Sequence, residues 1–411
     1  MTDALLAEFT PGKTIYLPGA TGEIVALTER LAADPGRMAG VHIVGCPLPG
    51  INGFDYAALA PDARQTVFLL PPALRTSFDA GKVRLHPLPY SGIAAWLEHE
   101  ADLDTAFTHV APPNAAGRCS FGIAADFSPI AWARARRRVA IVNSAMPAIP
   151  GPSIALAEAD AVYTLDAPLL TVDGGKPAPD IRAITTRAAA LIPDGAAIQI
   201  GIGGAPGALW PALAGHSDLR LRSGLVGAAF RPLAEAGVWR EAAGHVAGIA
   251  AGDESFYRWL ADWGGLHLAD ARTTHNAGTL QLEDRFFAIN SALEVDLFGQ
   301  ANLEWQSGRL NSGVGGAPDF ARAAMRSPGG LSMILMPATA RGGTVSRIVP
   351  RIEAPSVSLA RTDVDAVVTE HGVAMLRNAS LDERAEALIA IAAEPARDSL
   401  SRAWHSLRRS M

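Results

Sequence analysis

Short apolar runs alternate along the chain with longer stretches that are rich in alanine. The runs predict buried strands, because they are mainly apolar or β-branched and are bounded by turn-forming residues; in the first half they are 41–45, 66–70, 139–143 and 161–165. The alanine-rich stretches 129–138 and 183–191 are typical of helices. This alternation predicts α/β units built on mostly parallel sheets.

A second block of the same kind begins with the strand-like run 196–202, and the last strand-like run is 366–369. Between the two blocks, 166–180 is rich in proline, glycine and aspartate, which favours a domain junction. We therefore expect two domains, 1–185 and 186–411, since 411 residues exceed what one small core requires. Near the end, Ser380 and Glu383 have the spacing of a capping box that opens a helix over 384–392.

Composition excludes several classes of function. The net charge of −6 argues against nucleic acid as the main partner, because phosphate binding favours a basic face. Cys46 and Cys119 form neither a disulfide framework nor a metal-ligand cluster, and they fit a reducing cytoplasm. The N-terminus lacks a secretion signal, and no stretch reaches the roughly 18 apolar residues that span a bilayer. We expect a cytoplasmic protein without a metal.

One six-residue phrase occurs twice, as Gly-Ile-Gly-Gly-Ala-Pro at 201–206 and as Gly-Val-Gly-Gly-Ala-Pro at 313–318. Each copy lies near the end of an apolar or strand-like stretch. Glycines there let backbone amides approach a ligand, and the amides can receive a phosphate or a developing oxyanion. The two copies predict a site walled by glycine on more than one side, although the first could instead be a packing turn.

The first glycine phrase excludes two common nucleotide sites. It reads as a strand, a tight turn and a helix start, with Pro206 suited to the first helical position. The dinucleotide-binding fingerprint requires a third glycine at that place, which disfavours a nicotinamide cofactor. The phrase is also not followed by Lys-Ser or Lys-Thr, so it is not a P-loop.

Charged residues accompany the second glycine phrase. We interpret 290–300 as one apolar strand interrupted by Glu294 and Asp296, which lie two residues apart and hence on one face. They could be a base and the residue that orients it, or an ion pair with a buried arginine. A further strand at 331–337 leads to Arg341, which lies among glycines, where a cation could meet a phosphate or simply be solvated.

Taken together, these motifs resemble the acetyl-CoA hydrolase and CoA-transferase family, which includes 4-hydroxybutyrate and acetate CoA-transferases. The likeness runs nearly end to end, through 109–113, 117–122, 200–206, 290–300, 312–316, 367–374 and 381–385. It implies two open α/β domains of the CoA-transferase type with a CoA-thioester site between them. It also implies coenzyme A as a substrate, a carboxylate as a second substrate, and a homodimer.

The resemblance also implies which residues contact CoA. By position these are Gly201, Ile202, Gly203, Gly204, Ala205, Leu293, Ser312, Gly316 and Arg341. The family often has lysine at the last of these places, and arginine keeps the positive charge. The implied contacts agree with the interpretation of both glycine phrases as amide-rich walls.

The family's nucleophile is missing at its expected place. Family members use a glutamate that attacks the acyl-CoA and then carries CoA as a covalent thioester. The resemblance places Gly224 at that position, and no carboxylate lies between Asp218 and Glu235. Three hypotheses stay open: hydrolysis, decarboxylation or carbon–carbon cleavage by another route; binding of acyl-CoA without turnover, as a sensor; or an ordinary CoA-transferase, if Gly224 is not the equivalent residue.

Other polar residues are candidates for chemistry if turnover survives. Glu294 is the tentative catalytic base, and further candidates are Cys119, His109, Glu304 and His371. Each could equally be a framework residue that is buried or hydrogen-bonded.

Overall fold

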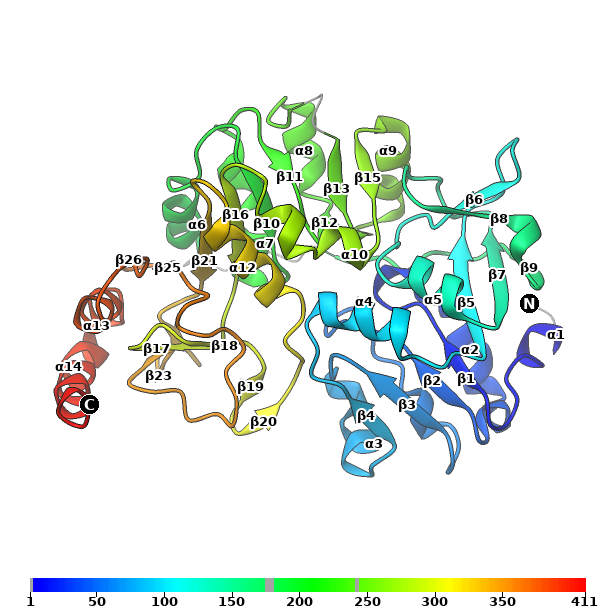
Figure 1. The fold of residues 1–411 in the computed structure, drawn as a ribbon, viewed down its shortest axis with the longest axis horizontal. Helices are drawn as coiled ribbons and strands as arrows, with labels where there is room; N and C mark the ends of the chain where they lie inside the picture. The colour runs from blue at the N-terminus through cyan, green and yellow to red at the C-terminus, as the bar shows by residue number, and fades with distance from the viewer. Residues whose placement is uncertain (1–2, 174–180, 241–243) are drawn as a thin grey trace.

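The computed structural model describes residues 3–173, 181–240 and 244–411, which form two α/β domains lying side by side (Figure 1). The first domain holds a seven-stranded sheet in which every pairing is parallel. Its strands, in spatial order, are β4 (Val83–Leu85), β3 (Arg64–Val67), β2 (His42–Val44), β1 (Thr14–Tyr16), β5 (Thr105–Val110), β7 (Arg137–Asn143) and β9 (Ala161–Leu165).

Helices pack against the first sheet and bury the interior strand β5. All six residues of β5 are buried. The α-helices of this domain are α1 (Asp3–Leu6), α2 (Val25–Ala33), α3 (Arg75–Asp79), α4 (Tyr90–His99) and α5 (Ser128–Arg134). Helix α4 faces the second domain and contacts α10 (Ala271–Thr274) there (Figure 1).

The second domain holds a six-stranded sheet that is parallel except for its last strand. In spatial order its strands are β11 (Arg220–Leu221), β10 (Ala197–Ile200), β16 (Phe286–Asn290), β21 (Leu331–Leu335), β25 (Ala366–Thr369) and β26 (Gly372–Met375). Its remaining α-helices are α6 (Ile181–Ala189), α7 (Gly204–Gly207), α8 (Phe230–Glu235), α9 (Glu254–Trp263), α11 (Ala277–Leu280), α12 (Ala317–Arg326), α13 (Leu381–Ala390) and α14 (Glu394–Arg409).

Small sheets supplement the two large ones. They are the pairs β6 (Arg118–Ser120) with β8 (Ser153–Ala155), β12 (Leu225–Gly227) with β14 (Ile249–Ala251), β13 (His245–Ala247) with β15 (Leu266–Leu268), β19 (Trp305–Gln306) with β20 (Arg309–Leu310) and β22 (Thr339–Ala340) with β23 (Val345–Ser346), and the triplet β18 (Ala301–Asn302), β17 (Glu294–Asp296) and β24 (Ile348–Val349). Of the helices in the described ranges, none combines the length and the apolar character that a membrane span requires.

The predicted α/β class with mostly parallel sheets is confirmed. The four expected strands of the first block correspond to β2, β3, β7 and β9, and the capping box at Ser380 and Glu383 is present at the start of α13. The expected burial of 161–165 was wrong, because β9 is the edge strand and pairs with β7 alone, so Val162 and Thr164 are exposed. The helix expected over 129–138 ends at Arg134, because β7 already begins at Arg137.

Three expectations about the second block were wrong. The stretch 290–300 is not one strand: Asn290 ends β16, and Glu294 begins β17 in a different sheet. Residues 366–369 are not the last strand, because the chain folds back through β26. Pro206 is the third residue of the short helix α7 rather than the first, and Gly204 takes the first position.

The predicted domain boundary at 185/186 falls inside α6. That helix contacts β21, β25 and β26, which all belong to the second sheet. We therefore propose that the second domain begins with α6 and that the junction lies within 166–180. Part of this segment, 174–180, is outside the described residues.

The two domains share an extensive interface. One hydrophobic cluster contains Val110 and Cys119 of the first domain together with Ile198 and Leu335 of the second. Backbone hydrogen bonds also cross the interface, among them Ala125 N to the carbonyl oxygen of Gly248 at 3.0 Å. The second glycine phrase lies directly at this interface.

Candidate functional site

A cavity of about 240 Å³ lies between the two domains. Leu48, Pro49, Leu69, Tyr90 and Asp126 line it from the first domain. The second domain contributes residues 199–202, 224, 225, 249, 275, 290, 291, 303, 312–317 and 320. Both glycine phrases therefore reach one cavity, together with the carboxyl ends of β10 and β16. The carboxyl ends of parallel strands are the usual place for a ligand in such sheets.

The first glycine phrase passes very close to its neighbouring strand. A Cβ atom at Gly201 would lie 2.6 Å from Oδ1 of Asn290, so only glycine fits without displacing that side chain. The Gly201 amide donates to the carbonyl oxygen of Ile289 at 2.8 Å and continues the ladder between β10 and β16. The Gly201 amide is therefore occupied by the strand pairing. The amides at the start of α7 have no hydrogen-bond partner within that helix.

The second glycine phrase connects the domain interface to a helix start. Gly313 lies against the first domain, where an added Cβ would be 2.2 Å from the carbonyl oxygen of Phe68. Gly316 is the N-cap of α12, and both Gly316 and Ala317 line the cavity. The N-terminus of a ten-residue helix therefore reaches the cavity wall, where its partial positive charge favours a negative group.

Gly224 lies in the cavity wall opposite a buried histidine. A Cβ atom at position 224 would lie 2.9 Å from Cε1 and 3.0 Å from Nε2 of His275. A Cβ atom at Gly316 would lie 2.4 Å from the same Nε2. The imidazole therefore occupies the notch between two glycines, and it fills the space that a side chain at position 224 would need.

Two aromatic rings pack against the imidazole of His275. Its ring centroid lies 4.5 Å from that of Tyr90 and 4.5 Å from that of Phe320. Nδ1 and the hydroxyl oxygen of Thr274 are 2.8 Å apart and share a hydrogen bond. Burial lowers the pKa of His275 to about 3, so the ring is neutral near pH 7.

Asp126 is a buried carboxyl group on the first domain's side of the cavity. Only 4% of the residue is exposed, and Oδ1 accepts a hydrogen bond from the Phe127 amide at 2.8 Å. None of the ion pairs among the described residues involves it. Burial without a cation raises the pKa of Asp126 to about 7.

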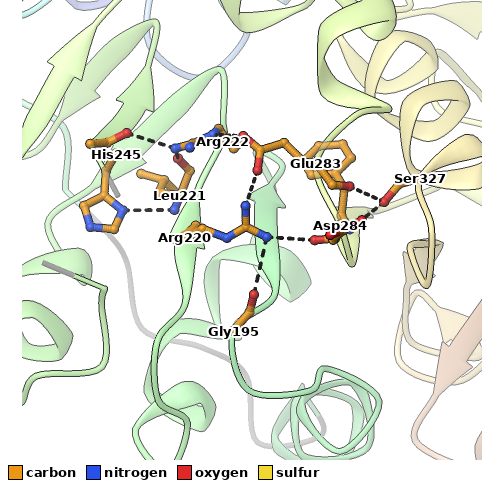
Figure 2. Close-up of polar contacts among 10 residues, drawn as sticks. Gly195, Arg220, Leu221, Arg222, His245, Glu283, Asp284 and Ser327 are labelled. Atoms are coloured by element: carbon orange, nitrogen blue, oxygen red, sulfur yellow. Dashed lines mark hydrogen bonds and ion pairs between the residues drawn. The ribbon is translucent and has the colours of Figure 1, made fainter. Parts of the chain in front are cut away.

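Arg222, two residues before Gly224, is not among the described residues that line the cavity, and Figure 2 shows its side chain directed towards Glu283. Its Nε donates to Oε1 of Glu283 at 2.5 Å, and Arg220 bonds the other oxygen of the same carboxylate. Ser327 donates to the Glu283 carbonyl oxygen at 2.5 Å, so the network joins β11 to the segments that precede β16 and β21. The two arginines hold the backbone that precedes Gly224, and Gly224 itself lines the cavity.

The implied CoA contacts separate into two groups. Gly201, Ile202, Ser312 and Gly316 line the cavity. Gly203, Gly204, Ala205, Leu293 and Arg341 are not among the described residues that line it. Arg341 is exposed in the β22–β23 hairpin, where its Nη2 donates to Ser307 Oγ at 2.7 Å.

Glu294 and Asp296 interact with other groups than those expected. Oε1 of Glu294 accepts from Asn302 Nδ2 at 2.8 Å. Asp296 is fully buried and accepts from the backbone amides of Phe298 and Gln300. Neither carboxylate forms an ion pair with an arginine among the described residues, so the structure does not support the ion-pair alternative. Asp296 stabilises a turn.

The other polar candidates are mostly bonded or buried elsewhere. Cys119 is buried in β6, and His109 bonds Asn143 through Nε2 at 3.1 Å. Glu304 accepts from Ser358 Oγ at 2.6 Å. The Nε2 of His371 lies 3.7 Å from the carboxylate of Glu370. None of these four is among the described residues that line the cavity.

Sequence reasoning missed Asp126 and His275, which do line the cavity. Asp126 interrupts the apolar run 121–127, and a lone carboxylate in such a run was the one available signal. His275 lies far from both glycine phrases in sequence and belongs to no motif recognised there. Among the described residues, no three His, Cys, Asp or Glu side chains cluster as a metal site would require.

Comparisons with known proteins extend these findings. The family model of the acetyl-CoA hydrolase/transferase C-terminal domain matches residues 252–404. The chain is 31% identical to the 4-hydroxybutyrate coenzyme A transferase of Clostridium kluyveri over 390 residues, which cover 93% of this chain and 91% of that protein. The crystal structure of RipA from Yersinia pestis superimposes with a TM-score of 0.91 at 27% identity, covering 99% of this chain and 96% of RipA. For the 4-hydroxybutyrate CoA-transferase of Porphyromonas gingivalis, the TM-score is 0.81 at 28% identity, with coverages of 100% and 96%.

Proposed function

The chain belongs to the acetyl-CoA hydrolase and CoA-transferase family, and on that premise we propose that it binds an acyl-CoA thioester between its domains and processes it without a glutamyl-CoA intermediate. One observation carries the proposal. Gly224, the residue that the resemblance places at the family's glutamate, lies in the cavity wall without a side chain, and His275 fills the adjoining space.

We assign the acyl group and the thioester of the substrate to the cavity, where both glycine phrases and Gly224 lie. The N-terminus of α12 supports binding of the developing oxyanion. We assign the nucleotide's phosphates to Arg341, which is exposed and always charged.

The absence of a nucleophilic carboxylate at position 224 favours water over a second acid as the group that attacks. Removal of a covalent nucleophile commonly lowers the rate by about 10³ to 10⁶. Glycine can form neither an anhydride nor a thioester with CoA. Hydrolysis, decarboxylation and carbon–carbon cleavage are the routes that remain without that intermediate.

The test is an assay with a panel of acyl-CoAs, each with and without acetate. Release of free CoA thiol or loss of the acyl chain without acetate is the expected result. If acyl exchange occurs only when acetate is present, the protein is an ordinary CoA-transferase. If CoA binds by calorimetry and no acyl-CoA changes, the chain is a sensor and the proposed turnover is wrong.

The family likeness also favours a homodimer. Sedimentation equilibrium over a range of protein concentrations measures the mass directly. A mass of twice 42.9 kDa is expected, and a single-chain mass throughout would contradict it.

A further inference from the structure

The cavity contains one acidic side chain among the residues that line it, and that side chain is Asp126. It approaches from the first domain, whereas Gly224 belongs to the second. The carboxyl group is buried, bonds one backbone amide and has no ion-pair partner among the described residues. A structural carboxylate in such a place is normally neutralised by a cation or by several amides, as Asp296 is in this same chain.

The surroundings of Asp126 hold it in position. Its carbonyl oxygen accepts a hydrogen bond from the Ala271 amide at 2.7 Å, and the carbonyl oxygen of Ala271 accepts one from the His275 amide at 3.0 Å. Two consecutive hydrogen bonds therefore connect the backbone of Asp126 to the residue that faces Gly224. The neighbouring residue Phe127 packs against Tyr90, with ring centroids 4.9 Å apart.

Resting on the proposed function, we propose that Asp126 is the general base that activates a water molecule for attack on the bound thioester. The carboxylate accepts a proton from water while the water oxygen bonds to the thioester carbonyl carbon. The carbonyl oxygen becomes an oxyanion facing the N-terminus of α12. Its collapse breaks the carbon–sulfur bond, and the proton passes from Asp126 to the sulfur. The products are a carboxylic acid and free CoA, and Asp126 is a carboxylate again.

The titration of Asp126 suits this task. The titratable groups that face it are Tyr16 of β1, Cys46 after β2 and Tyr90 of α4, and burial raises the pKa of each. His275 lines the same cavity and is neutral because burial lowers its pKa. Asp126 is therefore the group at this place that changes charge near neutral pH, where a general base is most effective.

The experiment compares the wild-type protein with Asp126→Asn and a matched control, Glu23→Gln. Glu23 is also a largely buried carboxyl whose pKa is raised by burial, but it bonds Asn52 and is not among the residues that line the cavity. Free CoA thiol is measured with the best acyl-CoA of the panel, CoA binding is measured by calorimetry, and folding is checked by thermal unfolding.

We expect Asp126→Asn to lower kcat by about 10² to 10⁴ while CoA still binds, because general-base catalysis commonly contributes that much. Glu23→Gln should keep the wild-type kcat. The wild-type kcat/KM should rise with pH, with its midpoint near the pKa of about 7 for Asp126. Asp126→Glu should recover part of the lost activity, since it retains a carboxylate.

Three results would overturn the assignment. The first is a folded Asp126→Asn protein with wild-type kcat. The second is a flat wild-type pH profile through neutrality, which decides the matter even if Asp126→Asn does not fold. CoA binding without hydrolysis of any acyl-CoA would also overturn the role of Asp126 and leave binding intact, whereas failure of CoA to bind would overturn the proposed function itself.

Discussion

The imidazole of His275 lies where a side chain at position 224 would begin. An added Cβ at Gly224 would be 2.9 Å from Cε1, closer than Cβ atoms normally approach another atom in folded proteins, and 3.0 Å from Nε2. The ring cannot easily move aside, because Tyr90 and Phe320 pack against it. Glycine at 224 and histidine at 275 therefore depend on each other, and the loss of one without the other creates a clash or a void.

This dependence predicts that Gly224→Glu alone will not create a CoA-transferase. Overpacking a filled site commonly costs about 1 to 3 kcal/mol, so we expect the free energy of unfolding to fall by that amount. The double variant Gly224→Glu/His275→Ala provides room for the carboxylate. It should gain acetate-dependent acyl exchange and a borohydride-sensitive glutamyl adduct that neither single variant shows.

Urea unfolding and the exchange assay measure both effects. His275→Ala alone is the control, because it creates the room without the carboxylate. Full transferase activity and unchanged stability in the single variant Gly224→Glu would mean that His275 does not block a side chain at position 224.

Gly316 offers a second probe of the same histidine. A Cβ there would lie 2.4 Å from Nε2 of His275, so Gly316→Ala should reduce the free energy of unfolding by about 1 to 3 kcal/mol and weaken acyl-CoA binding. Gly207→Ala is the matched control, since a Cβ at Gly207 has no neighbour within 4 Å. Equal stabilities of the two variants by chemical denaturation would refute the tight packing at Gly316.

The buried carboxyl of Asp126 predicts how stability depends on pH. Its pKa is about 7 in the folded protein and about 3.9 when unfolded, so the folded state binds more protons between these values. Its contribution to the free energy of unfolding therefore decreases as pH rises from about 4 to 7, by about 1.4 kcal/mol per pKa unit at most. Asp126→Asn should be more stable than the wild type at pH 8, and the difference should shrink towards pH 5.

Denaturant unfolding of both proteins across this pH range provides the measurement. An Asp126→Asn protein that is less stable than the wild type at pH 8 would show that the ionised carboxylate has a stabilising partner. That outcome would also weaken the case for a role in proton transfer.

The network behind Gly224 should matter for stability. Glu283 bonds both Arg220 and Arg222, and the side chains of all three are at most 21% exposed. Glu283→Gln leaves two guanidinium groups without their carboxylate, so we expect a loss of about 1 to 3 kcal/mol in the free energy of unfolding. Glu235→Gln removes an exposed partner of Arg231 and should cost less than about 1 kcal/mol. Similar losses for the two variants would argue against a structural role of the network.

Local pattern was sufficient to predict the α/β class but not every element. The run 139–143 is buried in β7 between two neighbouring strands, so its apolar character shows directly in the sequence. The stretch 290–300 was misread because two strands of different sheets, β16 and β17, follow one another within it. Sheet membership depends on partners that are distant in sequence, and no local pattern records it.

The glycine phrases were recognisable in the sequence because close contacts with neighbouring atoms exclude a side chain at Gly201 and Gly313. Asp126 and His275 were not, since their importance arises only when the two domains meet. A single aspartate and a single histidine carry no spacing signal of their own. The structure brings them to the same cavity as Gly224, which is the position that drew attention in the sequence.

The most direct test of the central claim is the mass of the intact protein during turnover. The protein is mixed with an acyl-CoA substrate, quenched with acid at short times and measured by mass spectrometry, while free CoA is followed in parallel. We predict that free CoA accumulates while the protein keeps its unmodified mass. A protein species heavier by one covalently bound CoA, formed and consumed at the rate of turnover, would contradict the account.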